Sequence, residues 1–215
     1  MSVATLSAPP LAATSVRPAS GPYRFTLEQY HAMIRAGILG EDDRVELIAG
    51  YLTQAMSVNP PHAASVYRCT EWLRARIDGD TGMLFSERPI SLPPHTEPEP
   101  DIVVAAHRAD AYATAHPTPD AISLVVEVAD DSLERDRKLK LPRYAEAGIA
   151  EYWIVNLRDR QLERYTEPLP ARPEVGQDAA YAKTAVARAG EVLEHERFGE
   201  VAVDALLPVG AEEES

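Results

Sequence analysis

Three acidic residues stand in apolar sequence, where a carboxylate is costly to bury. Glu127 lies inside ISLVVEVA (122–129), whose near-continuous apolar character indicates a central strand covered on both faces. Asp101 opens the apolar run 102–106, and Glu46 lies within RVELIAG. A buried carboxylate normally becomes protonated or acquires a partner. These three positions therefore predict either a functional site or a compensating contact for each acid.

Asp101 and Glu127 could share one cation if their strands are neighbours in a sheet. Neighbouring strands lie about 4.8 Å apart, so carboxylates at matching ends would be close together. Like charges at such a separation repel by roughly 4 kcal/mol at an effective dielectric of about 20, which favours a divalent cation between them. Ligand sets made only of oxygen are typical of Mg²⁺ or Mn²⁺ rather than of zinc. The pair is therefore a candidate metal site.

Each acid also has a purely structural explanation. Glu127 could form an ion pair with an arginine, or its strand could already have reached water. Asp101 follows a proline, and aspartate is common at such turns. Glu46 falls in a segment whose alternation would place it on a solvated face. Position alone does not separate these explanations from a ligand role.

Basic residues are concentrated just after Glu127. The stretch 134–146 holds five bases and three acids, within a chain of net charge -13. This is the obvious place for a phosphate to bind. The alternative is a solvated helix face on which Asp136 and Lys140 form an i,i+4 pair worth roughly a few tenths of a kcal/mol. Pro142 makes the helix begin or kink there, so the sequence does not fix the direction of Lys140.

Alternating helical and strand patterns must position these side chains. Helices are predicted at 26–37, 60–79 and 134–147, and strands at 44–49, 51–55, 83–92, 101–105, 122–129, 151–156, 161–166, 180–187 and 191–194. Thr26 and Gln29 form a capping-box pattern at the start of the first helix. The last three strands are expected to continue the same sheet. The pattern predicts an α/β (α+β) fold with a mixed β-sheet flanked by helices.

Composition limits the class of protein. The 215 residues are 45% apolar and 26% charged, which predicts one folded domain at 23–208 rather than a disordered chain. The segment 1–22, rich in Ala, Ser and Pro, predicts a disordered arm, and 209–215 predicts an acidic tail. No apolar stretch is long enough to cross a bilayer. With 34 acids against 21 bases, a generic charge-driven nucleic-acid binder is disfavoured.

Other kinds of site lack support in the sequence. Cys69 is the single cysteine, so no internal disulfide can form and a reducing cytoplasm fits best. The histidines show no zinc-ligand spacing, and His62, near a predicted helix start, is expected at the surface. There is no nucleophile elbow, Walker loop or dinucleotide-binding loop. The sequence therefore gives no support for an acyl-transfer enzyme or for an enzyme driven by nucleotide hydrolysis.

Four segments together resemble the Uma-two family of restriction endonucleases, over about residues 23–208: RVELIAG, EPEPDIVVA, LVVEVADDS and DRKLKLPRYAEAGIAEYWIVN. The resemblance is most detailed through 101–156. That family looks like a branch of the PD-(D/E)xK nuclease superfamily, whose fold is a mixed sheet flanked by helices. The resemblance implies that Pro100-Asp101 is the PD element, that Glu127 is the second acid, and that Glu46 is a further acid of the site.

The lysine departs from the plain superfamily motif. That motif would place a lysine two residues after Glu127, where this chain has Ala129. In the resembling family the lysine lies in the following segment, at a place that Lys140 matches, with Lys138 a close second. The resemblance therefore implies Lys140 as the catalytic lysine, but the sequence alone does not decide between the two.

The resemblance implies a metal-dependent endonuclease that hydrolyses phosphodiester bonds in DNA. Its implied metal ligands for Mg²⁺ (or Mn²⁺) are Asp101, Glu127 and Glu46, and its implied phosphate contacts are Arg137, Lys138 and Arg143. Two alternatives stay open. One is a catalytically inactive nuclease-like domain that serves as a binding or assembly module, and the other is an unrelated α/β protein whose Glu127 pairs with an arginine in the core. A homodimer would match the two-fold symmetry of nucleases that cut both strands.

Overall fold

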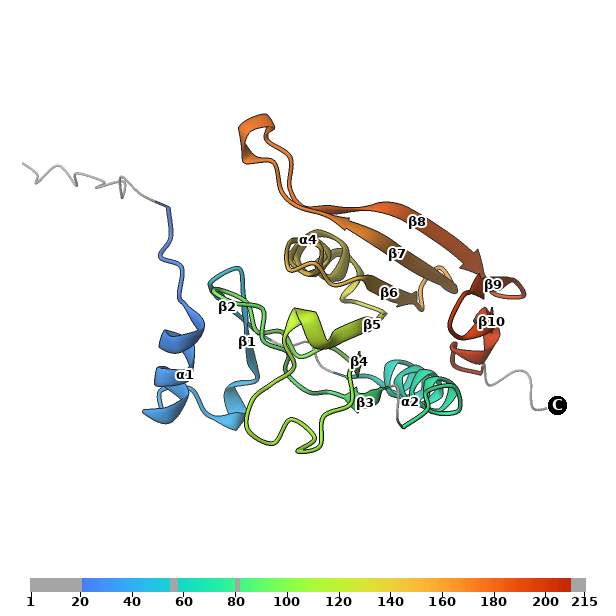
Figure 1. Ribbon diagram of the computed structural model, residues 1–215, viewed down its shortest axis with the longest axis horizontal. Helices are drawn as coiled ribbons and strands as arrows, with labels where there is room; N and C mark the ends of the chain where they lie inside the picture. Colours follow the sequence, from blue (N-terminus) through green and yellow to red (C-terminus); the bar gives the residue numbers. More distant parts are fainter. Residues whose placement is uncertain (1–20, 55–57, 80–81, 210–215) are drawn as a thin grey trace, which may run out of the picture.

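A six-stranded mixed sheet forms the centre of the computed structural model, which describes residues 21–54, 58–79 and 82–209 (Figure 1). In sheet order the strands are β3 (Met83–Ser86), β4 (Ile102–Ala105), β5 (Ile122–Ala129), β6 (Glu151–Asn156), β7 (Gln161–Leu169) and β8 (Ala180–Arg188). All neighbours are antiparallel except β5 and β6, which are parallel. The expected mixed sheet is confirmed. The expected N-terminal arm (1–22) and acidic tail (209–215) lie almost wholly outside the described residues.

Helices cover both faces of this sheet. On one face lies α2 (Pro60–Arg74), whose Trp72 and Leu73 pack with Val126 and Trp153. On the other face lies a helical segment made of α3 (Leu133–Arg135), η3 (Asp136–Lys140) and α4 (Leu141–Glu146). Side chains of a strand alternate between faces, so Val125 and Ala129 of β5 point toward this second segment. Glu127, between them in the alternation, shares that face.

The second helical segment contains a π-helical turn at η3. Pro142 has no N–H to donate to the carbonyl four residues earlier, and its ring would clash with that carbonyl. The helix therefore widens into a π-helical turn, in which the Leu141 N–H donates a hydrogen bond to the Asp136 carbonyl five residues earlier. The segment therefore runs on past Pro142 as one helix. Asp136, Lys140 and Tyr144, spaced four apart, are all buried on its inner side.

The N-terminal elements stand at one side of the sheet (blue, left in Figure 1). They are α1 (Leu27–Arg35) and the antiparallel hairpin of β1 (Val45–Ile48) and β2 (Tyr51–Gln54). The predicted capping box of α1 is present, and Ala49 and Gly50 form the predicted tight turn, both with positive φ. A backbone hydrogen bond of 2.7 Å from Glu97 to Leu47 ties the hairpin to the loop before β4. This contact holds β1 beside the site.

The C-terminal strands differ from expectation. β9 (Val192–His195) and β10 (Gly199–Ala202) pair with each other and form a separate two-stranded sheet, so the prediction that 191–194 continues the main sheet is wrong. Gly190, with φ of 83°, turns the chain after β8, and Leu193 and Val201 then pack into the core on the α2 side. The strand expected at 83–92 is also shorter, because Glu87 takes a positive φ just after β3.

Short helical turns complete the chain: η1 (Glu41–Asp43), η2 (Pro119–Ala121), η4 (Pro173–Val175) and η5 (Val203–Ala205). Figure 1 shows the hairpin of β7 and β8 extending well beyond the rest of the sheet. Within the described ranges, no helix has both the length and the apolar character needed to cross a membrane.

Candidate active site

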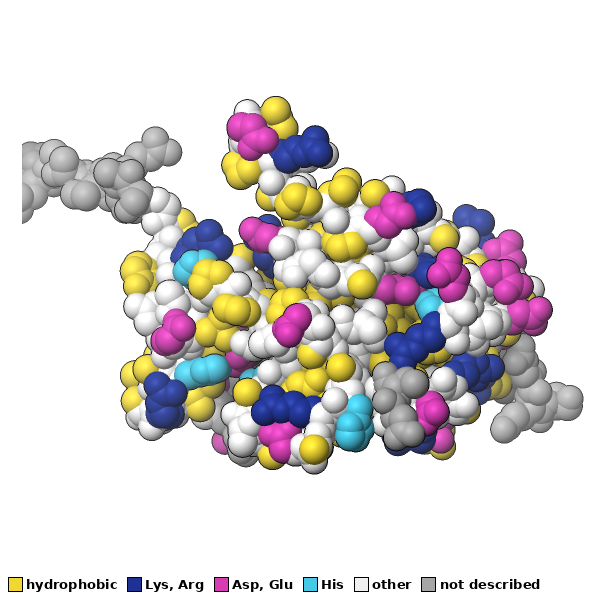
Figure 2. All heavy atoms as spheres, in the orientation of Figure 1, with side chains coloured by type: hydrophobic (Ala, Val, Ile, Leu, Met, Phe, Trp, Pro, Cys, Tyr) yellow, Lys and Arg dark blue, Asp and Glu magenta, His cyan; other side chains and the backbone are white. Residues whose placement is uncertain are grey.

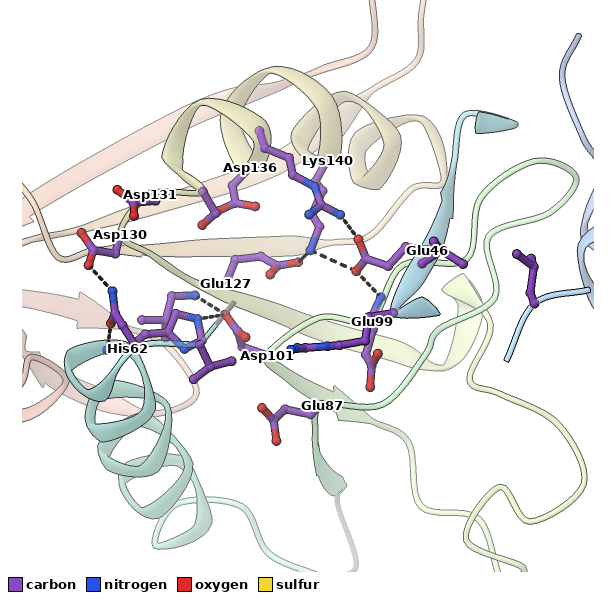
Figure 3. Close-up of a pocket in the computed structure, with 18 of the residues that line it drawn as sticks. Glu46, His62, Glu87, Glu99, Asp101, Glu127, Asp130, Asp131, Asp136 and Lys140 are labelled. Atoms are coloured by element: carbon purple, nitrogen blue, oxygen red, sulfur yellow. Dashed lines mark hydrogen bonds and ion pairs between the residues drawn. The ribbon is translucent and has the colours of Figure 1, made fainter. Parts of the chain in front are cut away.

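Sheet register brings Asp101 and Glu127 together. Ile102 of β4 pairs with Val126 of β5 in an antiparallel register, and continuing that register by one residue sets Asp101 opposite Glu127. The Oδ2 atom of Asp101 accepts a hydrogen bond of 2.6 Å from the backbone N–H of Val128, which fixes the acid at the end of β4. Both acids line a cavity of about 900 Å³ (Figure 3). The two strands that carry them are neighbours, as a shared metal site requires.

Glu127 is buried and held by two donors. Its Oε1 atom accepts hydrogen bonds from Lys140 Nζ at 2.8 Å and from the Tyr144 hydroxyl at 2.7 Å. Burial raises the pKa of Glu127 to about 8; the ammonium of Lys140 opposes the rise, while the carboxylates of Asp136 and Asp101 add to it. Glu127 is only 4% exposed, so the explanation that its strand has reached water is wrong. Its cationic partner is a lysine, and a cavity lies beside it, so the arginine-paired core network does not describe it either.

Glu46 joins the same site from β1. It is 5% exposed, so the expectation of a solvated face is wrong. The alternation argument fails because β1 is covered on both sides, with Glu46, Leu47 and Ile48 all buried. Its carboxylate forms an ion pair with Arg135, lies 3.6 Å from Lys140 Nζ, and accepts a 2.9 Å hydrogen bond from the backbone N–H of Glu99.

The structure separates the two lysines that the sequence left open. Lys140 is 5% exposed and lies between Glu127 and Glu46 (Figure 3). Lys138, two residues earlier, has a side chain that is 76% exposed and pairs with Glu134 on the outer side of the helix. Lys140 thus brings an ammonium group to the acids although position 129 is alanine. The solvated-face explanation is wrong for Lys140 and for Asp136, which are both buried.

The three residues expected to contact phosphates do not line the cavity. Arg137 is tied to Glu163 of β7, Lys138 to Glu134, and Arg143 to Glu146. The Lys and Arg side chains among the described residues that line the cavity are Arg44, Arg135 and Lys140. Arg135 belonged to the predicted basic stretch, whereas Arg44 carried no sequence signal, because its place depends on how the β1–β2 hairpin packs.

His62 is a site residue that the sequence argument placed at the surface. Its side chain is only 15% exposed, and Nε2 lies 3.3 Å from Asp101 Oδ2. Nδ1 is buried with no hydrogen-bond partner among the described residues. Burial lowers the pKa of His62, but Asp101 outweighs this effect, so the net pKa is raised. Asn59 caps α2 by accepting from the His62 N–H, yet nothing local reveals that this helix start abuts β4.

Carboxylates dominate the cavity wall. Among the described lining residues, eight acids face three Lys or Arg side chains and His62; the acids are Glu46, Glu87, Glu99, Asp101, Glu127, Asp130, Asp131 and Asp136. Burial and the nearby carboxylate of Glu87 raise the pKa of Glu99, while burial raises that of Asp136. Several carboxyl groups therefore share a space with too few cations to neutralise them.

The donor chemistry suits a hard divalent cation. No three Asp, Glu, His or Cys side chains in the described part of the chain stand close enough to form a ready-made metal cluster. Even so, Asp101 and Glu127 commit only Oδ2 and Oε1 to the hydrogen bonds described above, and both carry oxygen donors. Burial raises the pKa of Glu127, so a cation bound beside this carboxylate would stabilise its charged form. The oxygen donors of Asp101 and Glu127 therefore suit Mg²⁺ or Mn²⁺.

Comparisons with known proteins agree with this fold. The structure is similar to the crystal structure of a protein from Anabaena variabilis described as a putative nuclease belonging to DUF820, with a TM-score of 0.64 and 15% sequence identity. The match covers 85% of this chain and 97% of that one. No curated protein matches the chain. The model of the Uma2 family, described as "Putative restriction endonuclease", matches residues 27–205. The chain therefore belongs to the Uma2 family.

Proposed function

We propose that this protein is a metal-dependent endonuclease that hydrolyses phosphodiester bonds in DNA. The observation that carries the proposal is that Asp101, Glu127 and Lys140 together line one cavity. Asp101 directly precedes β4 and, with the register continued by one residue, faces Glu127 of β5, and Lys140 Nζ lies 2.8 Å from Glu127. Family membership supports a nuclease, and this arrangement supports the chemistry.

The acids would hold the metal. Asp101 and Glu127, with Glu46 from β1, would bind Mg²⁺ or Mn²⁺ through carboxylate oxygens. When bound, the ion would polarise a phosphoryl oxygen and lower the pKa of an attacking water. Lys140 keeps an ammonium group at the same spot, where it can donate to that water or to a phosphoryl oxygen as negative charge develops.

Phosphate contacts divide between the cavity and its surroundings. Arg135 lines the cavity, and its guanidinium can pair with a phosphate as it now pairs with Glu46. Arg137, Lys138 and Arg143 lie outside, so they could reach only the flanking phosphates of a longer strand. One cavity suffices to nick one strand, so the proposal holds for a monomer and for a homodimer.

Nicking of supercoiled plasmid in Mg²⁺ or Mn²⁺ tests the proposal. We expect the wild type to nick and Glu127→Gln to be inactive, because the amide removes the anionic ligand while keeping the shape of the side chain. Glu134→Gln is the matched control: this glutamate is exposed on the helical segment, outside the cavity, and its loss should leave the rate unchanged.

Two results separate the alternatives. Calorimetric titration with Mn²⁺ should show binding to the wild type and weaker binding to Glu127→Gln. Full nicking by Glu127→Gln, with metal binding unchanged, would overturn the assignment. Metal binding by the wild type without cleavage of any DNA would instead favour the catalytically inactive binding module.

A further inference from the structure

We propose that His62 is a positioning residue that orients the carboxylate of Asp101 for the metal ion. This inference rests on the proposed function and deepens it, because it names a residue that sets the metal affinity of the same site. Two observations carry it. His62 contacts Asp101 through one ring nitrogen only, and both fixed contacts of the Asp101 carboxylate fall on a single oxygen.

The carboxylate of Asp101 is held from two sides. Its Oδ2 atom accepts a hydrogen bond of 2.6 Å from the Val128 N–H of β5 and lies 3.3 Å from Nε2 of His62 on α2. Figure 3 shows these two contacts converging on that oxygen. Neither contact uses Oδ1, and both must break before the carboxylate can turn. The contacts therefore leave Oδ1 as the oxygen that can bind a metal ion.

The two ring nitrogens of His62 have different surroundings. Nε2 faces Oδ2 of Asp101, whereas Nδ1 is buried and has no hydrogen-bond partner among the described residues. A proton on Nδ1 alone would leave a buried N–H unpaired and would set the lone pair of Nε2 against those of the carboxylate. A proton on Nε2 gives the carboxylate a donor instead. Nε2 therefore donates to Asp101, and its lone pair is not available to a metal ion.

The first turn of α2 is fixed against the end of β5, which keeps His62 in place. The Oδ1 atom of Asn59 caps the helix by accepting a 3.0 Å hydrogen bond from the His62 N–H. The Nδ2 atom of the same side chain donates a 2.8 Å hydrogen bond to Asp130, which directly follows β5. One asparagine thus ties the backbone of His62 to the strand that carries Glu127. The imidazole is preorganised beside Asp101.

Metal affinity bears on DNA binding because the site has few basic side chains. The Lys and Arg side chains among the described cavity lining are Arg44, Arg135 and Lys140, and the lining acids outnumber them. On the face drawn in Figure 2, Lys and Arg side chains are scattered among acidic and apolar ones and form no continuous track. Phosphate binding beside Asp101 therefore relies on the charge of the metal ion. A residue that tightens metal binding also strengthens DNA binding when the metal is scarce.

Two variants that move one hydrogen-bond donor test the inference. The amide nitrogen of glutamine stands at the same position along the side chain as Nε2 of histidine, and that of asparagine stands at the position of Nδ1. We expect His62→Asn to weaken Mn²⁺ binding by about 10- to 100-fold in calorimetric titration, the usual loss when a partner of a metal ligand is removed. His62→Gln should restore most of the affinity. The Mn²⁺ concentration at half the maximal nicking rate should rise by the same factor in His62→Asn.

His31→Asn is the matched control. Nε2 of His31 also contacts a buried carboxylate, that of Glu97 at 2.7 Å, but neither residue is among the described cavity lining. The Mn²⁺ affinity of this variant should equal that of the wild type. Urea denaturation in EDTA should show the two His62 variants to be equally stable. Their difference in Mn²⁺ affinity then reflects the position of the donor and not a general loosening of α2.

Electron spin echo spectroscopy of Mn²⁺ bound to the wild type needs no variant. His62 is the one histidine among the described residues that line the cavity, so the signal of a directly bound ring nitrogen would identify it. We expect no such signal.

A directly bound nitrogen would overturn the inference and leave the metal site standing. Equal Mn²⁺ affinities of His62→Asn and His62→Gln, whether lowered or unchanged, would overturn it as well. If the wild type binds no Mn²⁺, the proposed function fails, and the inference fails with it.

Discussion

The buried carboxyl of Glu127 couples the stability of the metal-free protein to pH. Burial raises its pKa to about 8 from the ordinary value of 4.5. Between those two values the folded protein holds a proton that the unfolded chain has lost. A state that binds more protons loses stability relative to the other as pH rises. We therefore expect the free energy of unfolding, measured in EDTA, to fall through this window.

Urea denaturation at both ends of that window measures the effect, for the wild type and for Glu127→Gln. Glutamine does not titrate, so the variant should lose less stability as pH rises. The raised pKa values of Asp136 and Glu99 act in both proteins, and their contributions largely cancel in the comparison. An identical pH dependence in the two proteins would show that Glu127 titrates normally.

Variants of Lys140 and Lys138 can be compared directly, because each changes the net charge of the protein by the same amount. Both variants, Lys140→Gln and Lys138→Gln, remove one positive charge from the same helical segment. We expect Lys140→Gln to slow nicking by about 100-fold or more, because it removes a donor at the reacting centre. Lys138→Gln breaks only an exposed pair with Glu134 and should leave the rate unchanged. Equal losses in single-turnover assays would mean that both lysines act only by attracting DNA.

The acids of the site could be predicted from sequence, whereas much of their environment could not. Glu127 and Asp101 stand out because charge inside apolar strands is costly wherever those strands pack. His62 and Arg44 give no such signal, since their roles depend on contacts with β4 and β1 that are far away in the chain. Arg137 shows the converse problem. Its charge suggested a phosphate contact, but its side chain already forms an ion pair with Glu163, a buried acid on β7.

The ion pair of Arg137 and Glu163 anchors the helical segment to β7. Glu163 is 2% exposed. Although burial alone would raise its pKa, hydrogen bonds from Arg137, Asn156, Gln161 and Tyr165 hold that pKa at about 2. Such a depressed pKa stabilises the folded protein above about pH 4.5, and this stabilisation disappears as pH falls toward 2.

We therefore expect Arg137→Met to lower the free energy of unfolding by about 2 kcal/mol near neutral pH, somewhat less than for a fully buried pair because Arg137 is partly exposed. The difference from the wild type should shrink as Glu163 becomes protonated in acid. Arg143→Met is the control, since its partner Glu146 is largely exposed. Unchanged stability together with a raised KM for DNA would instead make Arg137 a phosphate contact.

Element prediction succeeded where one local rule governed the segment. The strands β5 and β6 have the predicted bounds, because continuous apolar runs need burial on both faces. The capping box of α1 and the turn at Ala49 and Gly50 are likewise local. The π turn at η3 could not be derived, since Pro142 excludes a regular helix but does not select the alternative. The separate pairing of β9 with β10 depends on packing against α2, which no local rule contains.

The net charge of -13 and the acidic cavity should make DNA binding depend on divalent cations. Without them we expect no detectable binding. In Ca²⁺, we expect the protein to contact about two phosphates of a single strand. A plot of the logarithm of affinity against the logarithm of salt concentration should then have a slope near -1.4, because each phosphate contributes about 0.7. Anisotropy of a labelled single strand from about 50 to about 200 mM KCl measures it. A slope steeper than about -4 would require a basic track outside the cavity, and Arg137, Lys138 and Arg143 would be the first side chains to replace.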